Sequence, residues 1–245
     1  MINLKPITFV IGLSLSKLAL FMWLPLLVAF FTGTAGTAEF LASAVLTHAI
    51  ALLLTRMGYQ QSFRLSVRDM FVLTTVVWVI MCVFASLPFL FLSKLSFTDA
   101  YFEAVSGLTT TGSTVLSNLD TLPMSVNLWR HQLVWVGGMG LIVLAIAILP
   151  LLGIGGRQMF KAETPGPMKD AKMTPRIAET AKGLWLVYFG VSVACILGYR
   201  WAGMTWFDAV CHGFSTMGLG GFSTHDASFG FFDSPAIEFV ASIFM

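Results

Sequence analysis

Several apolar runs in this chain are long enough to cross a lipid bilayer. The clearest cover residues 7–31, 71–92, 133–152 and 184–197. Of the 245 residues, 57% are hydrophobic and only 11% are charged, whereas about a quarter of the residues in a soluble domain are charged. A helix satisfies its own backbone polar groups in lipid, and about 20 helical residues cross the hydrocarbon core. The sequence therefore predicts an all-α integral membrane protein in which these uninterrupted apolar stretches cross the bilayer.

The positions of the charged residues predict an orientation. With a cytoplasmic amino terminus, ten Lys and Arg residues fall on the inner side and three on the outer side. The ten are Lys5, Arg56, Arg64, Arg68, Arg157, Lys161, Lys169, Lys172, Arg176 and Lys182, and the three are Lys94, Arg130 and Arg200. Lys and Arg are enriched in cytoplasmic loops, so this assignment is favoured. Most acidic residues fall on the outer side, where they would concentrate cations.

Two short apolar segments, Phe97–Leu108 and Trp206–Met217, each precede a cluster of Thr and Gly. Shifting the sequence by 109 residues superimposes them, with Asp99 on Asp208 and Gly112 on Gly221. The spans before them superimpose at the same offset. A constant offset over several elements indicates an internal repeat.

Each repeat predicts a spanning helix, a half-helix, an extended loop and a second spanning helix. Non-helical backbone at membrane depth is tolerated only where protein or a water-filled path satisfies it. Backbone carbonyls in such loops can replace the hydration shell of a cation, and the carboxyl-terminal end of a half-helix favours positive charge. Gly112 and Gly221 permit backbone angles that a Cβ opposes. The repeat therefore predicts a path for monovalent cations.

Three segments resemble the Trk/Ktr/HKT superfamily of potassium transporters, and the last two are most similar to its bacterial TrkH/TrkG type. They are residues 97–114 (FTDAYFEAVSGLTTTGST), 129–141 (WRHQLVWVGGMGL) and 207–225 (FDAVCHGFSTMGLGGFSTH). The resemblance implies four such units around one pseudo-fourfold pore, preceded by an extra helix pair, with two of the expected four units in this amino-terminal fragment. The expected parts are the extra pair at 1–58, the first pore unit at 64–152, a cytoplasmic linker at 153–173, and the second unit, truncated in its last helix, at 174–245.

The resemblance also implies a potassium filter in the two loops. Its expected residues are Thr109, Thr110, Thr111, Gly112, Ser113, Gly218, Leu219, Gly220, Gly221 and Phe222. Potassium contacts are expected at Thr110, Thr111, Leu219 and Gly220. In plant relatives a serine at the position of Gly112 accompanies sodium preference, so the glycine here fits the potassium-permeable pattern.

Glu103 in the first half-helix needs a partner, because a charge at the bilayer centre costs at least ~2.5 kcal/mol. Arg130, at the start of the following helix, is the expected structural partner. His212 takes the place of Glu103 in the second unit, so this pair cannot recur there. Gly137, Gly138 and Gly140 fit either close helix packing or a gating hinge.

Taken together, these features predict potassium uptake across a bacterial inner membrane by a multi-pass protein with a cytoplasmic amino terminus. Potassium is the expected substrate, with no covalently bound cofactor and no nucleic-acid partner. The resemblance implies a cytosolic nucleotide-binding subunit of TrkA type and a homodimer, and it leaves channel-like uptake and symport open. No Walker loop, GxGxxG or GxSxG element is present, so an enzyme is not expected. The alternative is a non-transporting membrane assembly subunit, or a membrane enzyme, that uses re-entrant loops for packing.

Overall fold

The computed structural model describes residues 3–60, 67–93, 95–148 and 173–245. Every regular element in these ranges is a helix, and four helical runs are long and apolar enough to span a membrane: Leu4–Thr32, Thr37–Gly58, Arg68–Leu92 and Ala181–Trp201. The prediction of an all-α membrane protein is therefore confirmed. The expected linker at 153–173 lies outside the described residues, except for its last residue.

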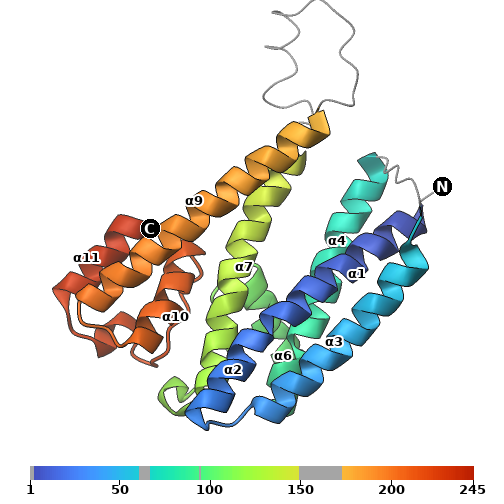
Figure 1. Ribbon diagram of the computed structural model, residues 1–245. Coiled ribbons are helices and arrows are strands. Elements are labelled where there is room, and N and C mark those ends of the chain that lie inside the picture. The colour runs from blue at the N-terminus through green and yellow to red at the C-terminus, as the bar shows by residue number, and fades with distance from the viewer. Residues whose placement is uncertain (1–2, 61–66, 94, 149–172) are drawn as a thin grey trace, which may run out of the picture.

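The first pair of helices packs along the helices between residues 67 and 148 (Figure 1). It contains α1 (Leu4–Phe21), α2 (Trp23–Thr32) and α3 (Thr37–Gly58). The predicted span is confirmed, since Leu4–Thr32 is one helical run long and apolar enough to cross a membrane. The structure adds a break within it, because α1 and α2 are separate at Met22. Pro25 has no N–H to donate to the carbonyl of Phe21, four residues earlier. Gln132 Nε2 donates to that carbonyl instead, at 3.0 Å.

The first of the two repeated units shows the same kind of break. Its elements are α4 (Val67–Ala85), α5 (Leu87–Leu92), α6 (Phe97–Leu108), the 3₁₀ turn η1 (Leu119–Thr121) and α7 (Met124–Ile148). The span predicted at 71–92 divides at Ser86, two residues before Pro88. The carbonyl of Ala85 next to this break accepts a hydrogen bond from Trp129 Nε1 at 3.0 Å. Side chains of α7 thus satisfy carbonyls at both proline breaks.

The second unit repeats this order with α9 (Met173–Trp201), α10 (Trp206–Met217), the 3₁₀ turn η3 (Ser228–Phe231) and α11 (Pro235–Phe244). The two half-helices, α6 and α10, have the predicted bounds, so this prediction is confirmed. By contrast, α7 begins nine residues before the apolar run at 133. The residues that hydropathy missed include Asn127 and Arg130, which are polar but buried.

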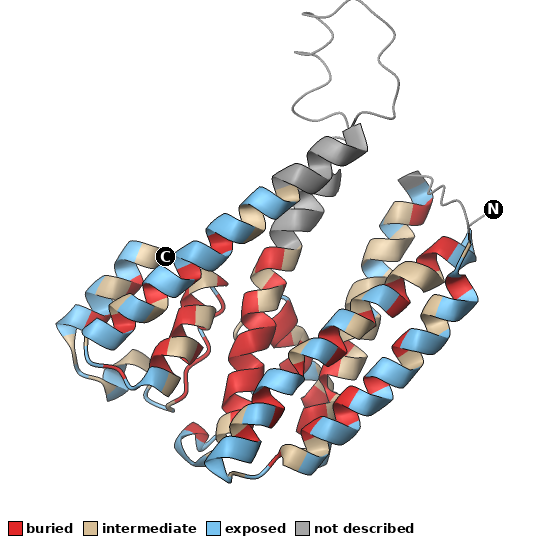
Figure 2. Cartoon of the chain, in the orientation of Figure 1, coloured by how far each residue is buried: buried red, intermediate tan, exposed pale blue. Residues whose placement is uncertain are grey.

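Helix α7 lies between the first helices and the α9–α11 group, and it forms the most continuous buried column of the molecule (Figures 1 and 2). Its glycines allow close contact: a Cβ on Gly137 would overlap the carbonyl of Leu108, and one on Gly138 would lie 3.0 Å from Cα of Gly218. The first contact is with the end of α6 and the second with the end of α10. These contacts favour packing over a hinge as the use of the glycines.

Candidate functional site: two re-entrant loops

The two half-helices begin with the same cap. Ser96 Oγ accepts a hydrogen bond from the N–H of Asp99 at 3.1 Å, and Thr205 Oγ1 accepts one from the N–H of Asp208 at 3.1 Å. Each hydroxyl also donates to the carboxylate of the same aspartate, at 2.7 and 2.6 Å. Because Ser and Thr caps satisfy otherwise unpaired amides, both half-helices start at equivalent positions.

The two half-helices also end alike. The amide of Thr111 donates to the carbonyl of Ser106 at 2.8 Å, and that of Gly220 donates to Ser215 at 3.0 Å. One residue earlier, Thr110 donates to Gly107 at 3.0 Å and Leu219 donates to Thr216 at 3.1 Å. Donors and acceptors are all related by the 109-residue offset. The repeat inferred from sequence is therefore present in the hydrogen bonding of the backbone.

Backbone handedness alternates along each loop. Thr110 and Gly112 have φ of 56° and 75°, and Leu219 and Gly221 have φ of 55° and 73°, whereas Thr111 and Gly220 between them do not have positive φ. Carbonyls of an ordinary extended chain alternate in direction, and reversing the handedness of every second residue removes that alternation. A left-handed residue other than glycine costs roughly 1–2 kcal/mol. The strain at Thr110 and Leu219 is therefore imposed by the surrounding hydrogen bonds.

The two loops lie against each other. A Cβ added to Gly112 would overlap the carbonyl oxygen of Gly220. The second loop also packs on α7, since a Cβ on Gly218 would lie 2.7 Å from the carbonyl oxygen of Val134. The structure thus brings together the first and second groups of predicted filter residues, which are about one hundred residues apart in sequence.

The side chains of the first loop are held by the half-helix in front of it. Ser106 Oγ donates to the carbonyl of Ser113 at 2.5 Å, and Thr109 Oγ1 donates to Val105 at 2.7 Å. Thr109 and Thr111 hydroxyls lie 2.8 Å apart. In the second loop, Leu219 is 61% exposed and Phe222 is buried. None of these side-chain arrangements is shared by the two loops.

Glu103 and Arg130 form an ion pair, with Arg130 Nε 2.7 Å from Glu103 Oε1 and both side chains fully buried. Glu103 also accepts from Thr114 Oγ1 at 2.9 and 3.0 Å and from the amide of Val115 at 3.2 Å. A buried charge needs such hydrogen bonds as well as a partner. The structure therefore places the expected pair directly behind the first loop.

In the second unit, contacts of a histidine ring replace the ion pair. His212, at the position of Glu103, lies 3.1 Å from Ser223 Oγ, and Ser223 is at the position of Thr114. The other ring nitrogen of His212 lies 2.9 Å from the carbonyl of Asp208. Sequence reasoning missed Thr114 and Ser223, although the 109-residue offset that found the glycines also aligns these two hydroxyls.

A polar cluster joins the segments that follow the two loops. His225 Nδ1 lies 2.5 Å from Asp120 Oδ1, and His225 Nε2 lies 3.5 Å from Asp208 Oδ1. Asp226 accepts from the amide of Leu119 at 3.0 Å. The hydrogen bond with His225, together with one from the amide of Asp226, holds the pKa of Asp120 below its ordinary value. The cluster links the first unit to the second beyond the predicted filter residues.

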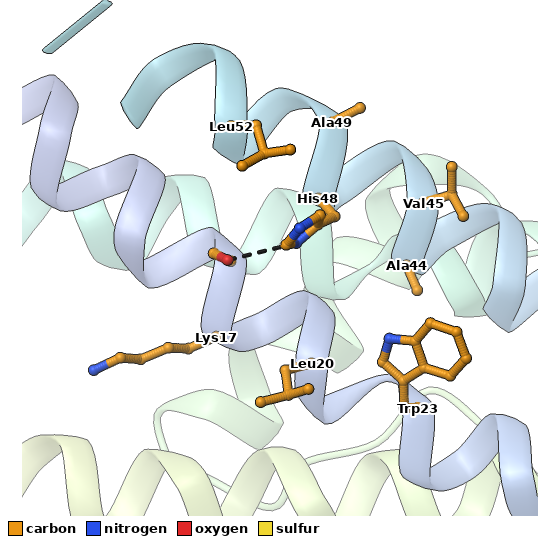
Figure 3. Close-up of a pocket in the computed structure, with 9 residues that line it drawn as sticks. Lys17, Leu20, Trp23, Ala44, Val45, His48, Ala49 and Leu52 are labelled. Carbon is orange, nitrogen blue, oxygen red and sulfur yellow. Dashed lines mark hydrogen bonds between the residues drawn. The ribbon is translucent and has the colours of Figure 1, made fainter. Parts of the chain in front are cut away.

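A pocket of about 590 Å³ lies elsewhere, between α1, α2 and α3. Ser16, Lys17 and His48 contribute to its lining, and Lys17 points away from His48 (Figure 3). Ser16 and His48 lie 3.4 Å apart through Oγ and Nδ1. The residues of this pocket belong to the extra helix pair, and none of them comes from the two loops.

Comparison with known proteins gives concordant matches. The family model TrkH, described as "Cation transport protein", matches residues 35–245. The "Trk system potassium uptake protein TrkH" of Halomonas elongata is 45% identical over 245 residues, which are 99% of this chain and 51% of that protein. The "Trk system potassium uptake protein TrkG" of Escherichia coli K12 is 41% identical over 244 residues, 99% of this chain and 50% of that protein.

A solved structure also matches. The crystal structure of the potassium transporter TrkH from Vibrio parahaemolyticus has a TM-score of 0.89 and 41% sequence identity, covering 99% of this chain and 49% of that one. The chain spans about half the length of the relatives it matches. The similarity includes both half-helices and both loops.

Proposed function

Because this chain belongs to the TrkH family of cation transport proteins, we propose that it supplies two of the four pore loops of a potassium uptake transporter. The family is one of transporters and not of enzymes. In this proposal potassium is the substrate, and the carbonyls of Thr110, Thr111, Leu219 and Gly220 contact it.

One observation carries the proposal: the two loops share a backbone but not side chains. Thr109, Thr110 and Thr111 align with Gly218, Leu219 and Gly220, yet φ angles and amide hydrogen bonds agree at each pair of equivalent positions described above. A site built from side-chain ligands would need similar side chains in both units. Backbone carbonyls are the groups that both loops present, and carbonyls are the ligands that replace water around a permeating alkali ion.

The neighbourhood of the two glycines supports a ring with further members. Gly112 contacts the second loop, whereas no described residue lies within 4 Å of a Cβ placed on Gly221, which has nearly the same φ. If each loop contacts the next as the first contacts the second, the open side of Gly221 is where a third loop would lie. The relatives are about twice as long as this chain, which leaves enough sequence for two more units.

The proposal also covers the membrane, the orientation of the protein and its partners. The positive-inside distribution supports a bacterial inner-membrane protein with a cytoplasmic amino terminus. The basic residues between 157 and 182 would then face the cytosol, where a nucleotide-binding subunit of TrkA type would meet them. A homodimer is proposed on the same family resemblance.

The test uses the whole coding sequence that contains residues 1–245, expressed in bacterial cells that lack their own potassium uptake. We expect growth at low potassium and uptake of rubidium in preference to sodium. Gly112→Ser should shift the preference toward sodium or abolish uptake. If a membrane-inserted protein takes up no rubidium, or if Gly112→Ser leaves uptake and preference unchanged, the loops serve only packing and the assembly-subunit alternative stands.

A further inference from the structure

Arg130 contacts more than its ion-pair partner. While Nε binds Glu103, Nη2 donates to Thr114 Oγ1 at 3.2 Å and Nη1 donates to the carbonyl of Ser223 at 3.3 Å. Cζ lies 4.4 Å from the centre of the Phe222 ring. The side chain is fully buried. One guanidinium therefore contacts the first half-helix and the segments that follow both loops.

The contacts fall at equivalent positions of the two units. Thr114 follows Gly112 by two residues, and Ser223 follows Gly221 by two residues. Arg130 thus bridges the same point of the first and second loops, close to where Gly112 meets Gly220. In the second unit, the position of Glu103 is taken by His212, which lies 3.1 Å from Ser223 Oγ.

We propose that Arg130 is a positioning residue that fixes the spacing of the two filter loops and so determines which alkali ion they accept. This inference rests on the proposed transport function. The guanidinium is planar and carries five N–H donors in a fixed fork, so it can hold several acceptors at set distances. Because a filter discriminates by the placement of its carbonyls, a change in the spacing of the loops alters selectivity.

A simpler role for Arg130 is to neutralise Glu103. The two roles predict different results when lysine replaces Arg130. A lysine ammonium supplies the same charge to Glu103, but it is a compact point charge without the planar fork. Lysine would therefore restore a neutralising role, whereas it would not restore simultaneous contact with Thr114, Ser223 and the Phe222 ring.

The experiment compares Arg130→Lys with Arg200→Lys in the protein expressed from its whole coding sequence. Arg200 is a matched control because it also lies against an aromatic ring, 5.5 Å from the centre of Trp206, and donates to a backbone carbonyl, that of Met204 at 3.2 Å. Neither contact is with a filter loop. Membrane content is measured by immunoblot, and the ratio of rubidium to sodium uptake is measured in intact cells.

We expect Arg130→Lys to lower the rubidium-to-sodium ratio about tenfold, the loss that corresponds to one hydrogen bond to a charged group. Arg200→Lys should leave the ratio unchanged. A wild-type ratio in Arg130→Lys overturns the inference and leaves only neutralisation. If the unmodified protein takes up no rubidium, it is the proposed transport function that fails.

A second variant covers the case in which Arg130→Lys does not reach the membrane. Thr114→Val keeps the shape of the side chain and both members of the Glu103–Arg130 pair, but it removes the acceptor of Nη2 and the hydroxyl that donates to Glu103. It should lower the ratio in the same direction by a smaller factor. A membrane-inserted Thr114→Val with the wild-type ratio would then overturn the inference.

Discussion

Replacing Gly112 by alanine should disturb the contact between the two loops by two separable effects. The first is backbone strain, because φ at Gly112 is 75° and a left-handed alanine costs roughly 1–2 kcal/mol. The second is overlap of the new Cβ with the carbonyl oxygen of Gly220, for which overpacking adds about 1–3 kcal/mol. The total is about 2–5 kcal/mol, the sum of these two ranges.

Gly33→Ala isolates the first effect. Gly33 has φ of 65°, but no described residue lies within 4 Å of a Cβ placed on it. Its cost should be only the roughly 1–2 kcal/mol of strain. Rubidium uptake at matched membrane content should therefore fall about 5- to 150-fold more in Gly112→Ala than in Gly33→Ala, since about 1.4 kcal/mol is tenfold. Equal uptake in the two variants would refute the close contact between the loops.

Two further predictions concern contacts around the loops. Gly137→Ala should lower stability by about 1–3 kcal/mol in thermal unfolding, because its Cβ overlaps the Leu108 carbonyl; Gly140→Ala, with its nearest contact at 3.6 Å, should change little, and equal losses would contradict the packing role. Asp120 has a pKa that is lowered in the folded protein. Its contribution to the stability of the fold is therefore present above the pKa of the unfolded chain, about 3.9, and is lost as the pH falls through the folded pKa. The wild-type protein should therefore be more stable than Asp120→Asn at pH near 7 and lose that advantage well below about pH 4; a difference independent of pH would argue against the ionised contact.

The two half-helices were predictable because local and repeated signals agree. Ser96 and Thr205 each stand three residues before an aspartate, apolar residues follow, and the offset of 109 aligns one segment with the other. The positive φ of Gly112 and Gly221 could also be predicted, since a glycine at the same position of two aligned polar loops often adopts a positive φ. These features depend on residues close together in the chain.

The proline breaks could have been found but were obscured by hydropathy. Pro25 and Pro88 lie inside apolar runs, which read as continuous spans when only hydrophobicity is considered. A proline leaves an unpaired carbonyl and crowds it. In lipid that carbonyl requires a donor, and the structure supplies Gln132 to the carbonyl of Phe21. Polar residues in the first part of α7 thus donate hydrogen bonds to backbone carbonyls, a role that hydropathy does not suggest.

The positive φ of Thr110 and Leu219 could not be predicted from residue type, because neither threonine nor leucine favours that conformation. The angle follows from the turn in which the next amide reaches back to Ser106 or Ser215. The hydrogen bond from Arg130 to the carbonyl of Ser223 was equally hidden, since every residue has a carbonyl and its use leaves no trace in sequence. Only the acidic partner of Arg130 could be inferred.

The unequal support of the two loops explains how two repeated units with different side chains can share one backbone conformation. Glu103 accepts hydrogen bonds from Thr114, Val115 and Arg130, so removing one member of the buried pair would strand a charge, at a cost of about 3–5 kcal/mol. His212 instead lies 3.1 Å from the corresponding hydroxyl of Ser223. Because Arg130 also reaches the Ser223 carbonyl, the arginine of the first unit supports the second loop as well. The second loop therefore has the same backbone angles as the first without an acidic residue at the position of Glu103.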